Sequence, residues 1–164
     1  MPGQRTPMLS TPIRKMALAA LIAFSLDQVS KLAMLVWLDL DTVHRIEVFP
    51  PYLNFLMAWN PGINFGVLGG YGARWLLVAV SVAVSLWLAV WARRQHGWLV
   101  PLATGAVIGG ALGNALDRVM YGAVVDFINM GCCGIHNPYA FNLADVWIAV
   151  GMVVIAVGHE KRRQ

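Results

Sequence analysis

Four long apolar stretches, separated by polar segments, dominate the pattern of hydrophobic and polar positions along the chain. They run roughly over residues 16–38, 74–92, 98–120 and 143–158. A helix needs about 20 residues to cross the hydrocarbon core of a bilayer, and the fourth stretch is slightly shorter than that. The pattern therefore predicts an all-α integral membrane protein with four transmembrane helices, formed by a single domain over residues 1–164.

The first apolar stretch follows a basic segment, as the core of a secretory signal peptide does. No small-residue cleavage site follows "KMALAALIAFSL", and the chain continues through "DQVSKLAMLVWL". We therefore expect an uncleaved first transmembrane helix.

The polar segment over residues 39–73 has a different pattern. Within "HRIEVF", Ile46 and Val48 alternate with Arg45 and Glu47, and two prolines follow. Alternation with a period of two, interrupted by proline, is typical of short strands beside a turn. The glycine-rich stretch "NPGINFGVLGGYG" comes next. The segment is thus expected to form a small β platform and a loop.

Composition and charge placement support the membrane assignment. The chain is 59% hydrophobic and only 12% charged, against about a quarter charged in soluble domains. Eight of its 12 Lys and Arg residues border the apolar stretches: Arg5, Arg14, Lys15, Arg93, Arg94, Lys161, Arg162 and Arg163. By the positive-inside rule, both termini face the cytoplasm, and residues 39–73 and 121–142 face outward. No basic stripe of the kind that binds nucleic acid is present in the sequence.

Two ionisable residues lie inside the first apolar stretch. Ionised groups at that depth are costly, so they are usually paired or functional. Asp27 and Lys31 are four positions apart and therefore share one face of a helix, with the acid first. This spacing favours a structural, self-neutralising pair over a catalytic role.

The third apolar stretch, "ATGAVIGGALGNALDRVMYG", carries two patterns. Glycines recur every four residues at Gly105, Gly109 and Gly113. Small residues at this spacing allow helices to approach closely in lipid. Near the end of the stretch, Asn114, Asp117 and Arg118 form one polar patch. Two interpretations are open: a buried network that locks the helix to its neighbours, and a substrate-binding shelf. The two are compatible, because a network that faces a cavity serves both packing and recognition.

Asp126 and Asp145 flank the most polar loop of the chain. Alone, Asp126 reads as a solvated loop acid, and Asp145 as the third residue of a capping box begun by Asn142. Because the loop joins the ends of two helices, close packing of those helices brings the two acids together. Such a pair shares one proton, so one acid activates a water while the other polarises an amide carbonyl. We expect Asp145, near a helix N-terminus, to ionise and Asp126 to hold the proton.

Four sequence blocks resemble those of the bacterial lipoprotein signal peptidases (signal peptidase II), over essentially the whole chain. They are "DQVSK" at 27–31, "NPGINFG" at 60–66, "GGALGNALDRVMYGAVVDF" at 109–127 and "FNLAD" at 141–145. The third and fourth are the most specific. The resemblance implies a membrane aspartic endopeptidase that cleaves prolipoproteins just before the cysteine carrying diacylglycerol.

The resemblance also implies roles for individual residues. Asp126 and Asp145 would be the catalytic dyad. The residues supporting the active site or binding substrate would be Asn60, Gly62, Asn114, Asp117, Arg118 and Asn142. No metal or cofactor is expected. The implied partners are lipidated prolipoproteins, membrane lipids and globomycin-type inhibitors. The enzyme would lie in the bacterial inner membrane, with its site at the periplasmic face.

Two other classes of protein compete with this interpretation. A metal-dependent lipid head-group transferase would use Asp117, Asp126, Asp145 and His136 as oxygen and nitrogen ligands of a hard cation. A small transporter or proton channel would place its ionisable groups, here Asp27, Lys31 and Asp117, near the midplane. The transferase would need its acids clustered on the cytoplasmic side, whereas here they are dispersed and predicted to face outward. The transporter is disfavoured because Asp126 and Asp145 lie at the membrane edge and not at the midplane. The adjacent Cys132 and Cys133 have no second pair with which to build a zinc site.

Overall fold

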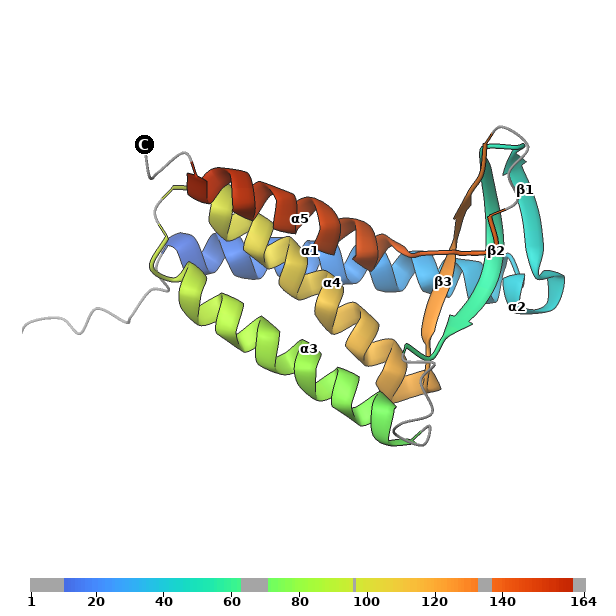
Figure 1. The fold of residues 1–164 in the computed structure, drawn as a ribbon, viewed down its shortest axis with the longest axis horizontal. Helices are drawn as coiled ribbons and strands as arrows, with labels where there is room; N and C mark the ends of the chain where they lie inside the picture. Colours follow the sequence, from blue (N-terminus) through green and yellow to red (C-terminus); the bar gives the residue numbers. More distant parts are fainter. Residues whose placement is uncertain (1–10, 63–70, 96, 133–136, 161–164) are drawn as a thin grey trace, which may run out of the picture.

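The computed structural model describes residues 11–62, 71–95, 97–132 and 137–160 (Figure 1). Its elements, in chain order, are α1 (Thr11–Leu32), a π-helical turn η1 (Ala33–Trp37), α2 (Leu40–Val43), β1 (Arg45–Phe49), β2 (Leu53–Asn60), α3 (Tyr71–Ala92), α4 (Leu99–Tyr121), β3 (Val124–Met130) and α5 (Leu143–Glu160). The four long helices form a bundle, and the strands lie across one end of it (Figure 1).

Three helical segments within the described part of the chain are long and apolar enough to cross a membrane. They are Pro12–Trp37, Ala73–Ala92 and Leu99–Tyr121, whereas the apolar part of α5, Leu143–Gly158, is shorter. Large apolar side chains on the outside of the bundle, such as Leu21 and Trp87, are more than 60% exposed. Such a surface suits lipid rather than water. The chain is therefore an integral membrane protein with a mostly helical fold.

Helix α4 is the centre of the bundle and packs against α1, α3 and α5. Its glycines make this close packing possible. A Cβ atom added at Gly109 would lie 2.9 Å from the Cβ of Ala23 in α1, and one at Gly110 would lie 2.6 Å from the carbonyl oxygen of Ala144 in α5. Real Cβ atoms do not approach so closely, so two neighbouring helices touch α4 at positions where only glycine fits.

The sheet is antiparallel with strand order β1-β2-β3. In the β2–β3 pair, Asn60 lies opposite Val124 and Ala58 lies opposite Asp126. Val125 and Phe127 of β3 are buried together with Leu40 of α2, and Met34 and Leu35 of η1 pack against them, so the sheet packs on the segment that follows α1. Strands were expected within residues 39–73, but β3 lies in the segment that was read as a loop. Residues 63–70, which hold most of the glycine-rich loop, are outside the described part.

Candidate active site

Asp126 is the third residue of β3 and is only 2% exposed. It is therefore not the solvated loop acid that the sequence suggested. Its Oδ1 accepts a hydrogen bond from Asn142 Nδ2 at 2.6 Å, and its Oδ2 accepts one from Asn60 Nδ2 at 3.0 Å. The pKa of Asp126 is raised to about 6: burial raises it most, the hydrogen bond from Asn60 partly offsets this rise, and the charge of Asp145 adds to it.

Asp145 lies in the first turn of α5, where it forms a capping box with Asn142. The backbone N–H of Asp145 donates to Asn142 Oδ1 at 3.0 Å, and the backbone N–H of Asn142 donates to Asp145 Oδ2 at 3.2 Å. The remaining carboxylate oxygen of Asp145 accepts a bond from Asn114 Nδ2 at 3.0 Å. Asp145 is only partly buried, so it is the more accessible of the two acids.

Asn142 links the two acids. Its fully buried side-chain amide donates to Asp126, while its side-chain oxygen and backbone N–H bond to Asp145. The end of β3 and the beginning of α5 therefore meet at one asparagine. The carboxylates of Asp126 and Asp145 thus both accept a hydrogen bond from Asn142, and each accepts one more from another asparagine.

Asn60 ends β2, where its orientation is set by a tight turn. Its Oδ1 accepts the backbone N–H of Gly62 at 2.9 Å, which leaves its NH₂ group facing Asp126. Gly62 has a φ of 96°, a left-handed conformation that favours glycine. The turn that the resemblance singled out thus aims an amide donor at the buried acid.

Arg118 lies beside the acids, near the C-terminal end of α4. One guanidinium nitrogen donates to the carbonyl oxygen of Asn114 at 3.1 Å, and a Cβ atom added at Gly62 would lie 3.6 Å from another. Its buried Nε has no hydrogen-bond partner among the described residues. Arg118 therefore brings a permanent positive charge with unused donors to the edge of the acid pair.

Asp117 belongs to a cluster of ion pairs with Lys31 and Asp27. Its carboxylate forms an ion pair with Lys31 at 2.7 Å, and Lys31 also pairs with Asp27 at 2.8 Å. Asp117 of α4 is therefore ion-paired with a residue of another helix, Lys31 of α1.

Gln28 belongs to the same cluster and was missed at the sequence level. Its Nε2 lies 3.1 Å from Asp27 Oδ2 and 3.0 Å from Asp117 Oδ1. Its position beside Asp27, inside an apolar stretch, was the signal that could have revealed it.

A metal centre receives no support from the described residues, among which no group of three His, Cys, Asp or Glu side chains could hold an ion. His136, one of the ligands that the transferase hypothesis required, lies outside the described residues, as does Cys133.

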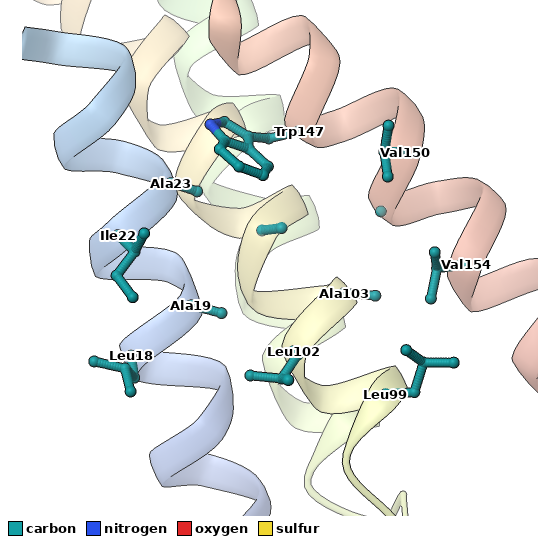
Figure 2. A pocket seen from close by; sticks show the side chains of 12 residues that line it. Leu18, Ala19, Ile22, Ala23, Leu99, Leu102, Ala103, Trp147, Val150 and Val154 are labelled. Carbon is teal, nitrogen blue, oxygen red and sulfur yellow. The ribbon is translucent and has the colours of Figure 1, made fainter.

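The bundle also contains an apolar groove of about 340 Å³, lined by side chains of α1, α4 and α5 (Figure 2). Leu18, Leu102 and Val154 are among the residues that line it, and Trp147 lies at one end. It contains none of the acids described above. The groove is therefore suited to apolar contacts within the membrane and carries no acid–base chemistry.

Comparison with known proteins identifies the family. A family model described as signal peptidase (SPase) II matches residues 19–159, most of the chain. The chain belongs to the signal peptidase II family. A protein named lipoprotein signal peptidase from Methylorubrum extorquens (strain PA1) is 42% identical over 146 residues, which cover 87% of this chain and 84% of the relative. One of the same name from Rhodopseudomonas palustris (strain ATCC BAA-98 / CGA009) is 40% identical over 150 residues, covering 88% and 91% of the two chains.

Solved structures agree with this membership in the signal peptidase II family. Two that are described as a bacterial membrane enzyme superpose with TM-scores of 0.74 and 0.76, at 28% and 27% identity. The first covers 93% of this chain and 91% of the solved chain, and the second covers 89% and 92%. Signal peptidase II is a peptidase family, so the chain is an enzyme of the aspartic peptidase type.

Proposed function

We propose that this enzyme removes signal peptides from diacylglyceryl-modified prolipoproteins by hydrolysing the peptide bond just before the lipidated cysteine. Asp126 and Asp145 are the proposed catalytic residues. The observation that carries this proposal is the bridge of Asn142 between the two acids, in a chain of the signal peptidase II family. Relatives named lipoprotein signal peptidase support the substrate class.

The two acids divide the chemistry according to their surroundings. Asp126 is buried, which favours its neutral form, and its pKa is raised to about 6. The neutral acid donates a hydrogen bond to the scissile carbonyl oxygen and stabilises the charge that develops there. Asp145, as a carboxylate, accepts a proton from the attacking water. That proton then passes to the leaving amine, so the dyad returns to its starting state.

Arg118 and Asn114 act as supports in this mechanism. Arg118 uses one guanidinium nitrogen on the carbonyl oxygen of Asn114, and its other NH₂ group, which lies near Gly62, is the proposed donor to a substrate carbonyl. Asn114 donates to Asp145 and holds in place the carboxylate that activates the water. Asn60 and Asn142 do the same for Asp126.

The proposed topology places the sheet end of the bundle at the periplasmic face of the bacterial inner membrane. Helix α3 ends beside Arg93 and Arg94 at the opposite end of the bundle (Figure 1), where positive charge marks the cytoplasmic side. Helix α5 is the proposed fourth span, and both termini are cytoplasmic. A lipidated substrate then arrives laterally through the bilayer, and its peptide bond meets the acids where water is available. Membrane lipids and globomycin-type inhibitors are the other proposed partners.

The test is cleavage of a lipidated prolipoprotein peptide by the purified enzyme. Asp126→Asn and Asp145→Asn are each expected to abolish turnover, with a loss of roughly a thousandfold or more, while inserting normally. Glu47→Gln is the matched control, because Glu47 is an exposed acid on the same sheet. Substantial cleavage by either Asp variant, or loss of cleavage in the control, would reject the assignment. Activity retained in a chelator separates this enzyme from a metal-dependent lipid head-group transferase.

A further inference from the structure

Three charged side chains, Asp27 and Lys31 of α1 and Asp117 of α4, form a buried cluster. Lys31 lies between Asp27 and Asp117, at 2.8 Å from one carboxylate and 2.7 Å from the other. All three side chains are nearly inaccessible to solvent. Removing so many charges from water costs more than the ion pairs alone recover, so net stability is a weak reason for such a cluster.

Each carboxylate of the cluster binds the backbone directly before one of the proposed catalytic acids. Asp27 Oδ1 accepts the N–H of Ala144, the residue before Asp145, at 2.9 Å. Asp117 Oδ2 accepts the N–H of Val125, the residue before Asp126, at 3.2 Å. The lysine that joins the two carboxylates therefore also joins the two backbone segments that carry the acids.

Lys31 has a third contact, which leads to Asp145 through a side chain. Its ammonium group donates to Asn114 Oδ1 at 2.9 Å, and Asn114 Nδ2 donates to Asp145 Oδ1 at 3.0 Å. A lysine can only donate, so it must face the oxygen of the Asn114 amide. The NH₂ group of that amide is thereby turned toward Asp145. Asn142 Nδ2 also donates to Asn114 Oδ1, at 3.1 Å, and favours the same orientation.

We propose that Lys31, together with Asp27 and Asp117, is a positioning device that sets the separation and orientation of Asp126 and Asp145. This inference rests on the proposed function of the two acids. Among the described residues, the cluster has no hydrogen bond or ion pair to either acid, and it acts through two backbone N–H groups and one amide. The positive charge of Lys31 also lowers the pKa of Asp126. Catalysis by two acids on one water and one carbonyl depends steeply on their geometry, so small displacements of either backbone reduce the rate.

The sharpest variant is Asp117→Asn. Three donors converge on the Asp117 carboxylate: Lys31 Nζ, the Val125 N–H and Gln28 Nε2. An asparagine has one accepting oxygen, and its NH₂ group repels any donor that it faces. The variant therefore loses at least one of these contacts. The side chain keeps its size, and the cluster loses one negative charge. Asp27→Asn disturbs the Ala144 contact in the same way.

The experiment measures kcat, KM and the unfolding midpoint of the full-length enzyme with a lipidated prolipoprotein peptide. Both variants are expected to lose roughly tenfold to hundredfold in kcat, with little change in KM, at temperatures where they are folded. Gly105→Ala is the matched control, because its new Cβ would meet the backbone oxygen of Met16, away from the acids. It should lower the unfolding midpoint and leave the kcat of the folded enzyme unchanged.

A purely structural cluster predicts a different result. The proposal is overturned if folded Asp117→Asn has the kcat of the wild type, or if Gly105→Ala loses kcat as much as the Asp variants do. Should the Asp variants not fold, Gln28→Leu takes their place, since it removes one bond to each carboxylate and no charge. A folded Gln28→Leu with unchanged kcat overturns the proposal, and a several-fold lower kcat supports it. Activity in Asp126→Asn would instead reject the proposed function itself.

Discussion

Asn142 and Asp145 cap each other at the N-terminus of α5. The side-chain oxygen of Asn142 accepts the backbone N–H of Asp145, and the backbone N–H of Asn142 donates to the Asp145 carboxylate. Because the oxygen of the Asn142 amide is occupied by this cap, its NH₂ group must point the other way, toward Asp126. One residue therefore begins a helix and orients a donor at the other proposed catalytic acid.

These two tasks of Asn142 are separable by substitution. Serine is a good helix N-cap but is too short to reach Asp126, whereas alanine does neither task. We expect Asn142→Ala to be about 1 kcal/mol less stable than Asn142→Ser, because only alanine loses the cap. Both variants should lose turnover alike, by roughly tenfold or more, since both lose the donor to Asp126. Unfolding midpoints and cleavage rates check this expectation, and a fully active serine variant would contradict it.

Gly62 controls the turn that aims Asn60 at Asp126. An alanine at this position must adopt a φ of 96°, and its Cβ would collide with the Leu77 side chain. The left-handed conformation alone costs about 1 kcal/mol or more for a residue other than glycine. Gly62→Ala is therefore expected to displace the Asn60 amide and lower kcat several-fold, with little loss of global stability because the turn is exposed. Cleavage kinetics give the kcat of the variant, and an unfolding curve gives its stability. A loss of global stability large enough to account for the lower kcat would contradict the prediction.

Asn60 also tunes the proton on Asp126. Its amide donates to the carboxylate and thereby partly offsets the effect of burial, which leaves the pKa of Asp126 at about 6. If neutral Asp126 is the form that works, activity falls as the pH rises through that pKa. Asn60→Ala removes the donor, so the pKa rises further and the falling limb of the kcat/KM profile moves to higher pH. Glu47→Gln should leave the limb in place. A rising limb that moves to higher pH in Asn60→Ala, with the falling limb unchanged, would mean that ionised Asp126 is the working form.

Local sequence patterns predicted the structural features that residues close together in the sequence determine. Apolar length indicated the membrane segments, and the spacing from Asn142 to Asp145 indicated the capping box, because both patterns are set within one element. The glycines of α4 indicated close packing, although not which helices would approach.

Contacts between distant segments were not predictable in the same way. The partner of Asp117 is Lys31, which lies on another helix, and nothing near Asp117 in the sequence specifies that pairing. Strand β3 was missed because its polar residues, Asp126 and Asn129, suggested a loop. Both are buried in the sheet, where they bond to side-chain amides or backbone oxygens that come from other segments. The apolar residues Val124, Val125 and Phe127 were the overlooked signal for a strand.

Burial of Asp126 also has a consequence for the stability of the fold. Its pKa rises from 3.8 to about 6 on folding, so the folded protein binds a proton more tightly than the unfolded chain does. This contribution to stability is complete below pH 3.8 and is lost as the pH rises through about 6. The loss is of the order of 2–3 kcal/mol, because each pKa unit corresponds to about 1.4 kcal/mol. Asp126→Asn cannot titrate, so its stability should change less between about pH 4 and about pH 7 than that of the wild type.

The comparison requires unfolding midpoints of both proteins in the same detergent over that pH range. Other titrating groups are common to the two proteins, so the difference between the two curves isolates Asp126. We expect the variant to gain stability relative to the wild type as the pH rises, while it remains inactive at every pH. Parallel curves would mean that Asp126 has the same proton affinity in the folded and unfolded chains, and that water or another donor compensates its burial. The neutral acid required by the proposed mechanism would then lack its physical basis.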